Sequence, residues 1–207
     1  MKVQPKNRRL GVMLSGRGSN FEAIADNIAR GALDAEIAVV ISNVESARGL
    51  AIARERAFDT VVIPSRGITR ESFDAQVIEA LNERNVGLVV LAGFMRVFSP
   101  RMTAAFPNLM VNIHPSLLPS FPGVDVQRQA LEYGVKFSGC TVHLVTDTLD
   151  GGPILLQAAV PVLEDDTPDT LAERILNEEH RIYSEAIGLV LDGRFDLEGR
   201  RVRRMDL

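Results

Sequence analysis

Short apolar segments alternate with amphipathic segments along most of this chain of 207 residues, and this alternation constrains the fold more than any other feature. The apolar segments have the length of strands and lie at residues 10–14, 37–42, 60–63, 86–92 and 109–113. Between the first two, the segment 21–28 repeats its apolar residues at intervals of three and four, which is the period of a helix. Strands that alternate with helices over short connections predict an α/β domain with a mostly parallel, twisted sheet flanked by helices.

The helices expected between these strands have recognisable end signals. Gly31 ends the first helix, and the second is expected at residues 47–57. Thr69 is suited to cap the third helix. Ser99 precedes a proline, and this pair is typical of a helix cap followed by the first helical residue. These signals support the alternating order of strands and helices.

The second half of the chain adds a strand pair and a long helix. Strands are expected at residues 138–145 and 153–162, on either side of a turn at 146–152. The last helix is expected to begin after Thr167 and to reach about residue 190, and residues 195–202 are expected to form a small hairpin. The chain is therefore expected to fold as one domain.

Composition and charge exclude several classes of protein. The hydrophobic fraction of 46% and the charged fraction of 24% are ordinary for a globular domain. The formal charge of −4 argues against a nucleic-acid partner, and the basic segment 199–204 follows a general preference for arginine, with 20 Arg against 3 Lys. The longest apolar run, residues 86–95, is half as long as the roughly 20 residues of a membrane span. We therefore expect neither nucleic acid nor a membrane as a partner.

The sequence gives little support for a metal site, a disulfide or a serine nucleophile. The single cysteine, Cys140, excludes an internal disulfide and fits a reducing cytoplasm, and no apolar stretch follows the basic N-terminus as in a secretory signal. Cys140 and His143 are three residues apart, so on a strand they face opposite sides. Neither a His-Glu-x-x-His motif nor a Gly-x-Ser-x-Gly elbow is present. We expect no metal.

A glycine-containing loop follows the first expected strand and precedes the first helix. Gly16 and Gly18, followed by Ser19 and Asn20, allow a phosphate to approach free backbone N–H groups at a helix N-terminus. A tight turn between strand and helix explains the same residues equally well. Phe21 stands where the dinucleotide fingerprint has its third glycine, and the Gly-Lys-Ser/Thr of a mononucleotide loop is absent. If the loop binds a ligand, a monophosphate fits it best.

An amide and an imidazole end the fifth expected strand. Asn112 and His114 are two residues apart, so they point to the same side, at the carboxyl end where α/β sheets bind ligands. Such a pair can hold a carbonyl oxygen and its developing negative charge, and a histidine with its ordinary pKa of about 6.5 can also transfer a proton. Asp150, in the turn after the next strand, could orient the imidazole. Each feature alone also has a plain structural explanation, as a strand-end cap or a turn signal.

Five motifs in order carry a resemblance to a known family. They lie at residues 15–20, 91–96, 112–119, 142–153 and 178–183. Together they identify the chain, from about residue 10 to residue 191, as similar to the folate-dependent formyltransferases, and most similar to members that act on glycinamide ribonucleotide. The resemblance implies a Rossmann-like fold, with a phosphate-binding half at about residues 9–108, a folate and catalytic half at about 109–191, and a tail at 192–207.

The activity implied by the resemblance is transfer of the formyl group of 10-formyltetrahydrofolate to the amine of glycinamide ribonucleotide, in purine biosynthesis. The enzyme would be cytoplasmic, would use the folate as a co-substrate without a metal, and could form a homodimer. Asn112, His114 and Asp150 would carry catalysis, with Asn112 and a protonated His114 stabilising the tetrahedral oxyanion. His143 would support this group, and Asp150 would keep His114 charged.

The resemblance also implies two groups of binding residues. The phosphate and ribose of the ribonucleotide would be held by Gly18, Ser19, Asn20 and Glu179. The folate would be contacted by Arg70 at its glutamate tail, by Asn112, and around its pterin by Met95, Arg96, Val97 and Phe98.

Two departures from the family pattern and three alternatives remain. Residues 124–127 replace histidines that relatives often carry, and Leu176 replaces a polar ribose contact. A methionyl-tRNA formyltransferase would need a further domain of about 100 residues. A formyltetrahydrofolate deformylase would need an N-terminal regulatory domain. A non-catalytic sugar-phosphate binding module on the same scaffold would not need Asn112, His114 and Asp150 together.

Overall fold

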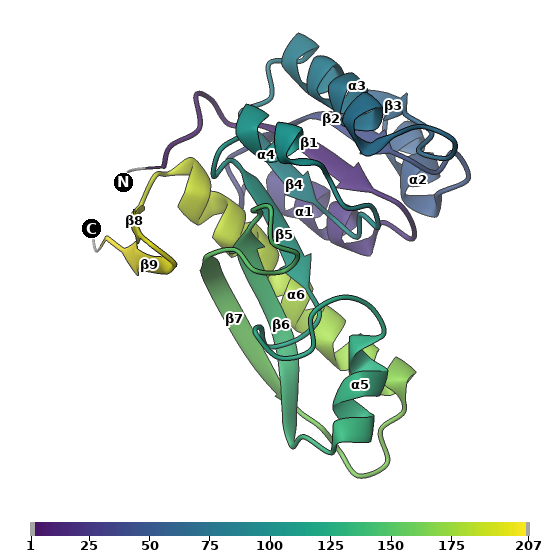
Figure 1. Ribbon diagram of the computed structural model, residues 1–207, viewed down its shortest axis with the longest axis vertical. Coiled ribbons are helices and arrows are strands. Elements are labelled where there is room, and N and C mark those ends of the chain that lie inside the picture. The colour runs from purple at the N-terminus through teal and green to yellow at the C-terminus, as the bar shows by residue number, and fades with distance from the viewer. Residues whose placement is uncertain (1–2, 206–207) are drawn as a thin grey trace.

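A single seven-stranded sheet forms the centre of the computed structural model, which describes residues 3–205 (Figure 1). Its strands are β1 (Arg9–Leu14), β2 (Glu36–Ser42), β3 (Thr60–Val62), β4 (Leu88–Leu91), β5 (Met110–His114), β6 (Phe137–Leu144) and β7 (Ile154–Pro161). The helices are α1 (Ser19–Ala29), α2 (Arg48–Glu55), α3 (Arg70–Glu83), α4 (Pro100–Ala105), α5 (Val126–Tyr133) and α6 (Pro168–Leu191). A separate hairpin, β8 (Phe195–Glu198) and β9 (Arg201–Arg204), follows α6.

The sheet is mostly parallel, as predicted. Its strand order is β3-β2-β1-β4-β5-β6-β7, and the strands from β3 to β5 pair in parallel. β6 and β7 pair antiparallel, because they form a hairpin that follows β5. The predicted strands, helices and terminal hairpin are confirmed, whereas α5 was not predicted. Residues 206–207 of the expected tail, and residues 1–2, lie outside the described part of the chain.

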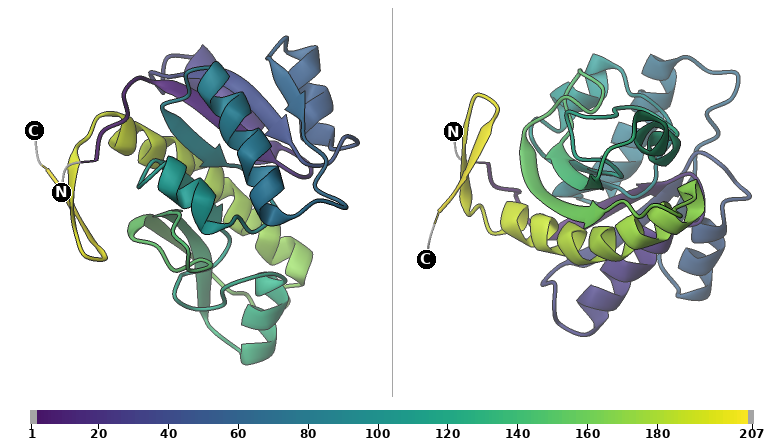
Figure 2. Two further views of the ribbon diagram at one scale, coloured as in Figure 1. Left: turned by 45° about the horizontal axis from the view of Figure 1, so that its top comes forward. Right: turned by 90° about the horizontal axis from the view of Figure 1, so that it is seen from below.

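Helices cover both faces of the sheet (Figure 2). Buried residues of α1, α2 and α6 share one apolar cluster, and those of α3 and α4 form a second with the opposite face. Apolar side chains on both faces explain why strands such as residues 88–91 are apolar throughout. The Tyr183 hydroxyl of α6 lies 2.9 Å from the Leu91 carbonyl oxygen and 3.2 Å from that of Val111, which fixes α6 against β4 and β5.

The strand order creates a switch point beside β1. The chain leaves β1 toward β2 and β3, then crosses back so that β4 pairs with the other side of β1. Loops that follow β1, β4 and β5 therefore meet at one edge of the sheet, where α/β folds bind ligands. Among residues 3–205, no helix combines the length and apolar character needed to cross a bilayer.

Candidate active site at the carboxyl edge of the sheet

Asn112 and His114 lie at the carboxyl end of β5, which pairs with β6. Antiparallel pairing places Asn112 opposite His143 and His114 opposite Thr141. The Asn112 side-chain nitrogen Nδ2 lies 3.2 Å from His143 Nε2. His114 and His143 are both buried. The pairing of β5 with β6 therefore puts two imidazoles and one amide next to each other.

Asp150 reaches this group from the turn between β6 and β7. Its Oδ2 lies 3.5 Å from His114 Nδ1, and its Oδ1 lies 3.8 Å from His143 Nε2. The Gly123 backbone N–H donates to the same Oδ2 at 2.9 Å. The Asp150 side chain is only 8% exposed, so its charge acts on the imidazoles with little screening by water. The structure thus brings together residues that are 36 positions apart in sequence.

Both ring nitrogens of His114 face oxygen acceptors. Nδ1 faces the Asp150 carboxylate, and Nε2 lies 2.9 Å from the Phe121 carbonyl oxygen. A carbonyl and a carboxylate only accept hydrogen bonds, so the ring satisfies both only when each nitrogen carries a hydrogen. A hydrogen on Nε2 is directed at the loop of residues 115–125, through the Phe121 carbonyl.

The glycine loop has a backbone that only glycine accommodates. Gly18 has a φ of +84° at the start of α1, and a Cβ on it would lie 2.5 Å from the Gly49 Cα. The Gly49 N–H donates to the Gly16 carbonyl at 3.0 Å, which holds the loop against α2. No side chain caps the first turn of α1 in the described structure. Its backbone N–H groups are thus free to bind an anion.

Asn20 and Glu179 pair with each other beside this loop. Asn20 Nδ2 donates to Glu179 Oε2 at 2.7 Å, across 159 positions of sequence. Burial raises the pKa of Glu179, while the Asn20 hydrogen bond and the charges of His114 and Arg17 act in the opposite direction. The glycine loop and the end of β5 lie at the same carboxyl edge of the sheet, because β1, β4 and β5 are neighbouring parallel strands. The buried Asn20 Oδ1 has no partner in the described structure.

Hydrogen bonds of Ser15 join the loops that follow β1, β2 and β4. Its hydroxyl donates to Asn43 Oδ1 at 2.6 Å and accepts from the Met95 N–H at 2.9 Å. Its own N–H donates to the Gly93 carbonyl at 3.1 Å. The serine fixes the position of the residues 93–98 relative to the glycine loop. Sequence reasoning did not assign this role, although Ser15 directly follows the first strand.

The stretch from Met95 to Phe98 has alternating exposure. Met95 is 76% exposed and Val97 is 44% exposed, while Arg96 turns inward. The Arg96 guanidinium donates to the carbonyls of Ser65 and Ile68 at 2.7 and 3.2 Å, and it lies 4.8 Å from the centre of the Phe73 ring. Arg96 therefore shapes the loop leading to α3 from inside, and the exposed apolar side chains of the stretch are those available to a ligand.

Arg70 stands at the first residue of α3, exposed to solvent. Thr69 caps this helix as predicted, accepting from the Ser72 N–H at 3.1 Å. A cation in the first turn is disfavoured by the helix dipole. Helix stability therefore does not account for an arginine at this position.

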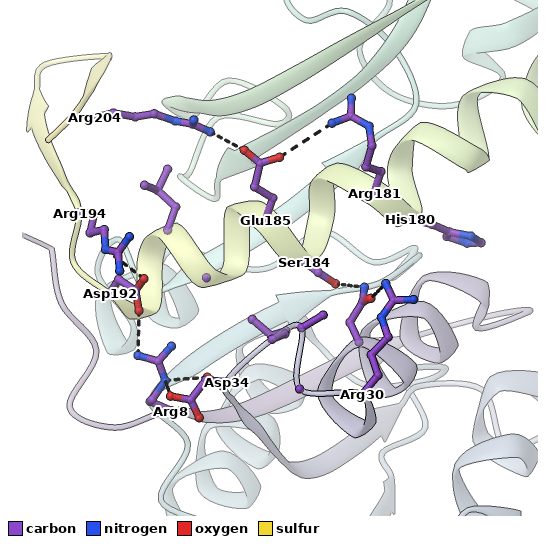
Figure 3. A pocket seen from close by; sticks show the side chains of 16 residues that line it. Arg8, Arg30, Asp34, His180, Arg181, Ser184, Glu185, Asp192, Arg194 and Arg204 are labelled. Carbon is purple, nitrogen blue, oxygen red and sulfur yellow. Dashed lines mark hydrogen bonds and ion pairs between the residues drawn. The ribbon is translucent and has the colours of Figure 1, made fainter. Parts of the chain in front are cut away.

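A groove of about 750 Å³ lies elsewhere, between the α1–β2 connection and the outer side of α6 (Figure 3). Arg8 is 3.1 Å from Asp34 and 2.9 Å from Asp192. Glu185 is 3.0 Å from Arg204 and 3.9 Å from Arg181. These charges already compensate one another, so the chemistry is better supported at the carboxyl edge of the sheet. No group of three or more histidine, cysteine or acidic side chains with metal-binding geometry occurs within residues 3–205.

Comparison with known proteins identifies the family. A profile described as formyl transferase matches residues 8–187, which is most of the chain. The chain belongs to the formyl transferase family. The resemblance inferred from the five motifs is thereby confirmed, and the site described above lies within the matched part of this formyl transferase.

Individual relatives agree with this assignment. The chain is 42% identical to the phosphoribosylglycinamide formyltransferase of Escherichia coli over 187 residues, which cover 90% of this chain and 88% of that protein. The crystal structure of glycinamide ribonucleotide transformylase 1 from Symbiobacterium toebii has a TM-score of 0.94 and 53% identity, covering 97% of this chain and 95% of that one. The predicted formyltransferase fold is confirmed by this match.

A third relative is a much longer protein. The chain is 43% identical over 192 residues, 92% of its length, to the trifunctional purine biosynthetic protein adenosine-3 of Bos taurus. These residues make up 19% of that protein, so this formyl transferase spans about a fifth of the length of the relative.

Proposed function

We propose that this formyl transferase moves the formyl group of 10-formyltetrahydrofolate to the amine of glycinamide ribonucleotide, as a step of purine biosynthesis. The observation that carries the proposal is the group formed by Asn112, His114 and Asp150, beside an uncapped helix N-terminus. An amide donor and an imidazolium held by a buried carboxylate suit a tetrahedral oxyanion. A helix N-terminus suits the phosphate of the acceptor.

The proposed reaction is an acyl transfer between two nitrogens. The acceptor amine attacks the formyl carbon, and its electron pair forms the new C–N bond while the carbonyl pair moves to oxygen. Asn112 and His114 donate hydrogen bonds to that oxyanion, and Asp150 balances the imidazolium charge. The bond from carbon to N10 of the folate then breaks, the amine loses one proton and N10 gains one. No redox partner is needed.

The loop that follows β5 has to move before the Nε2 hydrogen of His114 can contact the substrate. The Nε2 hydrogen is directed at the Phe121 carbonyl, which also accepts from the Ser116 hydroxyl at 3.1 Å. A substrate oxygen would replace or share that carbonyl as the acceptor. The Ser116 hydroxyl, which is 2.6 Å from the Ser120 carbonyl, keeps an acceptor when this happens.

The ribonucleotide is assigned to the glycine loop and α6. The backbone N–H groups of Ser19 and Asn20 would hold its phosphate, with Gly18 permitting the close approach. Glu179 would accept hydrogen bonds from the ribose hydroxyls. Its Oε2 already accepts from Asn20, which orients the carboxylate before the ribose arrives.

We expect Gly18→Ala to raise the KM for the ribonucleotide about 30-fold, because a displaced helix N-terminus forfeits the roughly 2 kcal/mol that it can contribute to anion binding. The added Cβ would meet the Gly49 Cα at 2.5 Å, so the loop has to move. The matched control is Gly31→Ala at the other end of α1, where φ is +72° but the Cβ meets no atom within 4 Å. Steady-state kinetics with each substrate varied should show the effect for the ribonucleotide alone. An equal rise in the folate KM would show that the phosphate of the ribonucleotide does not bind at this loop.

The folate is assigned to the exposed stretch after β4 and to the start of α3. Met95, Val97 and Phe98 would line the pterin, with Arg96 supporting the backbone from within. Arg70 would pair with the glutamate carboxylate. This assignment explains an arginine in the first turn of α3, where the helix dipole opposes it.

Arg70→Ala should weaken folate binding by up to about fivefold, which corresponds to the roughly 0.2–1 kcal/mol of an exposed ion pair. The value of kcat should hardly change, because the pair lies away from the reacting carbon. Arg54→Ala removes another exposed arginine, on α2; it serves as the control and should leave the folate KM unchanged. With a formylated folate that lacks the glutamate, Arg70→Ala should have no effect. A persisting effect there would refute the carboxylate contact.

Small molecules are proposed as the substrates, with no role for nucleic acid or a membrane, and the cytoplasm as the compartment. The division into a phosphate-binding half and a folate half, and a homodimer, stay predictions.

The proposal is tested by offering one formyl donor to three acceptors. Purified protein receives 10-formyltetrahydrofolate with glycinamide ribonucleotide, with charged methionyl-tRNA, or with water alone, and the formylated products and formate are quantified. Turnover is expected only with the ribonucleotide. Formate release at a comparable rate without an acceptor would instead indicate a deformylase, and binding without turnover would indicate a binding module.

A further inference from the structure

His143 contacts the Asn112 amide directly from the neighbouring strand. It lies on β6 directly opposite Asn112 and is 2% exposed. Its Nε2 is 3.2 Å from Asn112 Nδ2. Asp150 Oδ1, at 3.8 Å, lies beyond hydrogen-bond distance from the same nitrogen. Of the Asn112 amide and the Asp150 carboxylate, only the amide lies within hydrogen-bond distance of His143 Nε2.

The backbone fixes which nitrogen of His143 carries the hydrogen. Nδ1 lies 3.0 Å from the carbonyl oxygen of Leu144, which can only accept. The hydrogen of the neutral ring is therefore on Nδ1, and Nε2 presents a bare lone pair. Burial lowers the pKa of His143, and the nearby His114 acts in the same direction, while Asp150 and the Leu144 contact oppose them. The lowered pKa indicates a neutral His143 ring at pH 7.

A bare lone pair selects one orientation of the Asn112 amide. The Nδ2 group donates one hydrogen to His143 Nε2 and keeps a second hydrogen for another acceptor. With the amide turned by 180°, Oδ1 would face the His143 lone pair, and two acceptors would stand about 3 Å apart without a hydrogen between them. The ring thus decides whether the amide offers N–H or oxygen to its surroundings.

We propose that His143 is a positioning residue that holds the Asn112 amide with its nitrogen toward the reaction centre, so that the second N–H is available to the oxyanion. This inference rests on the proposed function of Asn112. It assigns His143 no contact with the substrate and no proton transfer. Its effect on the rate passes entirely through Asn112.

Two substitutions separate this role from simple packing. His143→Phe keeps a ring but removes the acceptor, so the amide is free to turn. We expect kcat to fall at least about tenfold, and by no more than the 10²–10³-fold expected for loss of an oxyanion donor. His143→Gln offers a carbonyl oxygen near the same place and should retain kcat within about threefold. The KM for the ribonucleotide should stay unchanged in both, because its phosphate site lies on α1.

The decisive arm repeats His143→Phe in an Asn112→Ala background. If His143 acts only through the amide, kcat of the double variant should equal that of Asn112→Ala within about twofold, since coupled residues are not additive. An equal loss in both backgrounds, or no loss in either, would overturn the inference. Wild-type protein that transfers no formyl group would instead contradict the proposed function.

A measurement on the unmodified protein guards against a variant that fails to fold. Nitrogen NMR of protein with ¹⁵N-labelled histidine should show the His143 hydrogen on Nδ1 and none on Nε2 at pH 7. A hydrogen on Nε2 would overturn the inference, because that nitrogen could no longer accept from Asn112. This result is independent of whether the protein transfers a formyl group.

Discussion

His114→Ala is expected to lower kcat for formyl transfer by about 10²–10⁴-fold, the range typical of a lost general acid. The imidazole is buried, faces Asp150 at 3.5 Å and sits at the end of β5, where the reacting carbon is proposed to lie. The KM for the ribonucleotide should change little. Rapid-quench kinetics with both substrates saturating would measure the loss in the chemical step.

Asp150→Asn should be similarly severe, because it removes the charge that balances the imidazolium while keeping the shape of the side chain. If His114 and Asp150 act as one unit, the double variant should be little slower than the slower single variant. Thermal unfolding and ribonucleotide binding provide controls for folding. Losses that simply multiply would show that the two residues act independently, which contradicts the imidazolium–carboxylate pair.

Asn112→Ala carries the second large effect, about 10²–10³-fold in kcat, or roughly 2.7–4 kcal/mol, as for other oxyanion donors. The cost arises in the transition state, where the carbonyl oxygen becomes negative, so affinity for the ribonucleotide should survive. Asn27→Ala is the control: Asn27 is a buried asparagine of α1 whose amide donates to the Ser184 hydroxyl of α6 at 2.7 Å, away from Asn112. If Asn27→Ala were as slow as Asn112→Ala, the loss of kcat would reflect a general loss of stability.

The order of strands and helices could be predicted because it depends on local patterns. Apolar runs such as residues 88–91 are covered on both faces, and Thr69 caps α3 through its own hydroxyl. The helix α5 escaped prediction because only Val126 and Ala130 of its eight residues are buried, which leaves a weak periodic signal. Its start at Asp125, with a φ of +57°, also lacks a side-chain cap.

The site could be predicted in its residues but not in its contacts. Asn112 and His114 share a face by strand geometry alone, whereas Asp150 reaches them only because β6 pairs back along β5. The pairing of Asn20 with Glu179 spans 159 positions, and no local rule indicates it. Such contacts depend on the tertiary arrangement, as does the inward turn of Arg96 toward the loop before α3.

One formyl group is proposed to pass directly from the folate to the acceptor amine where Asn112, His114 and Asp150 meet. The most direct test is a single-turnover experiment with isotope in the formyl group, in which wild-type protein and Asn112→Ala are both saturated with glycinamide ribonucleotide. Wild-type protein is expected to deliver the label to the ribonucleotide, while Asn112→Ala, with the ribonucleotide still bound, should deliver it about 10²–10³-fold more slowly. Label released as formate regardless of the acceptor, or transfer by Asn112→Ala at the wild-type rate, would contradict this proposal.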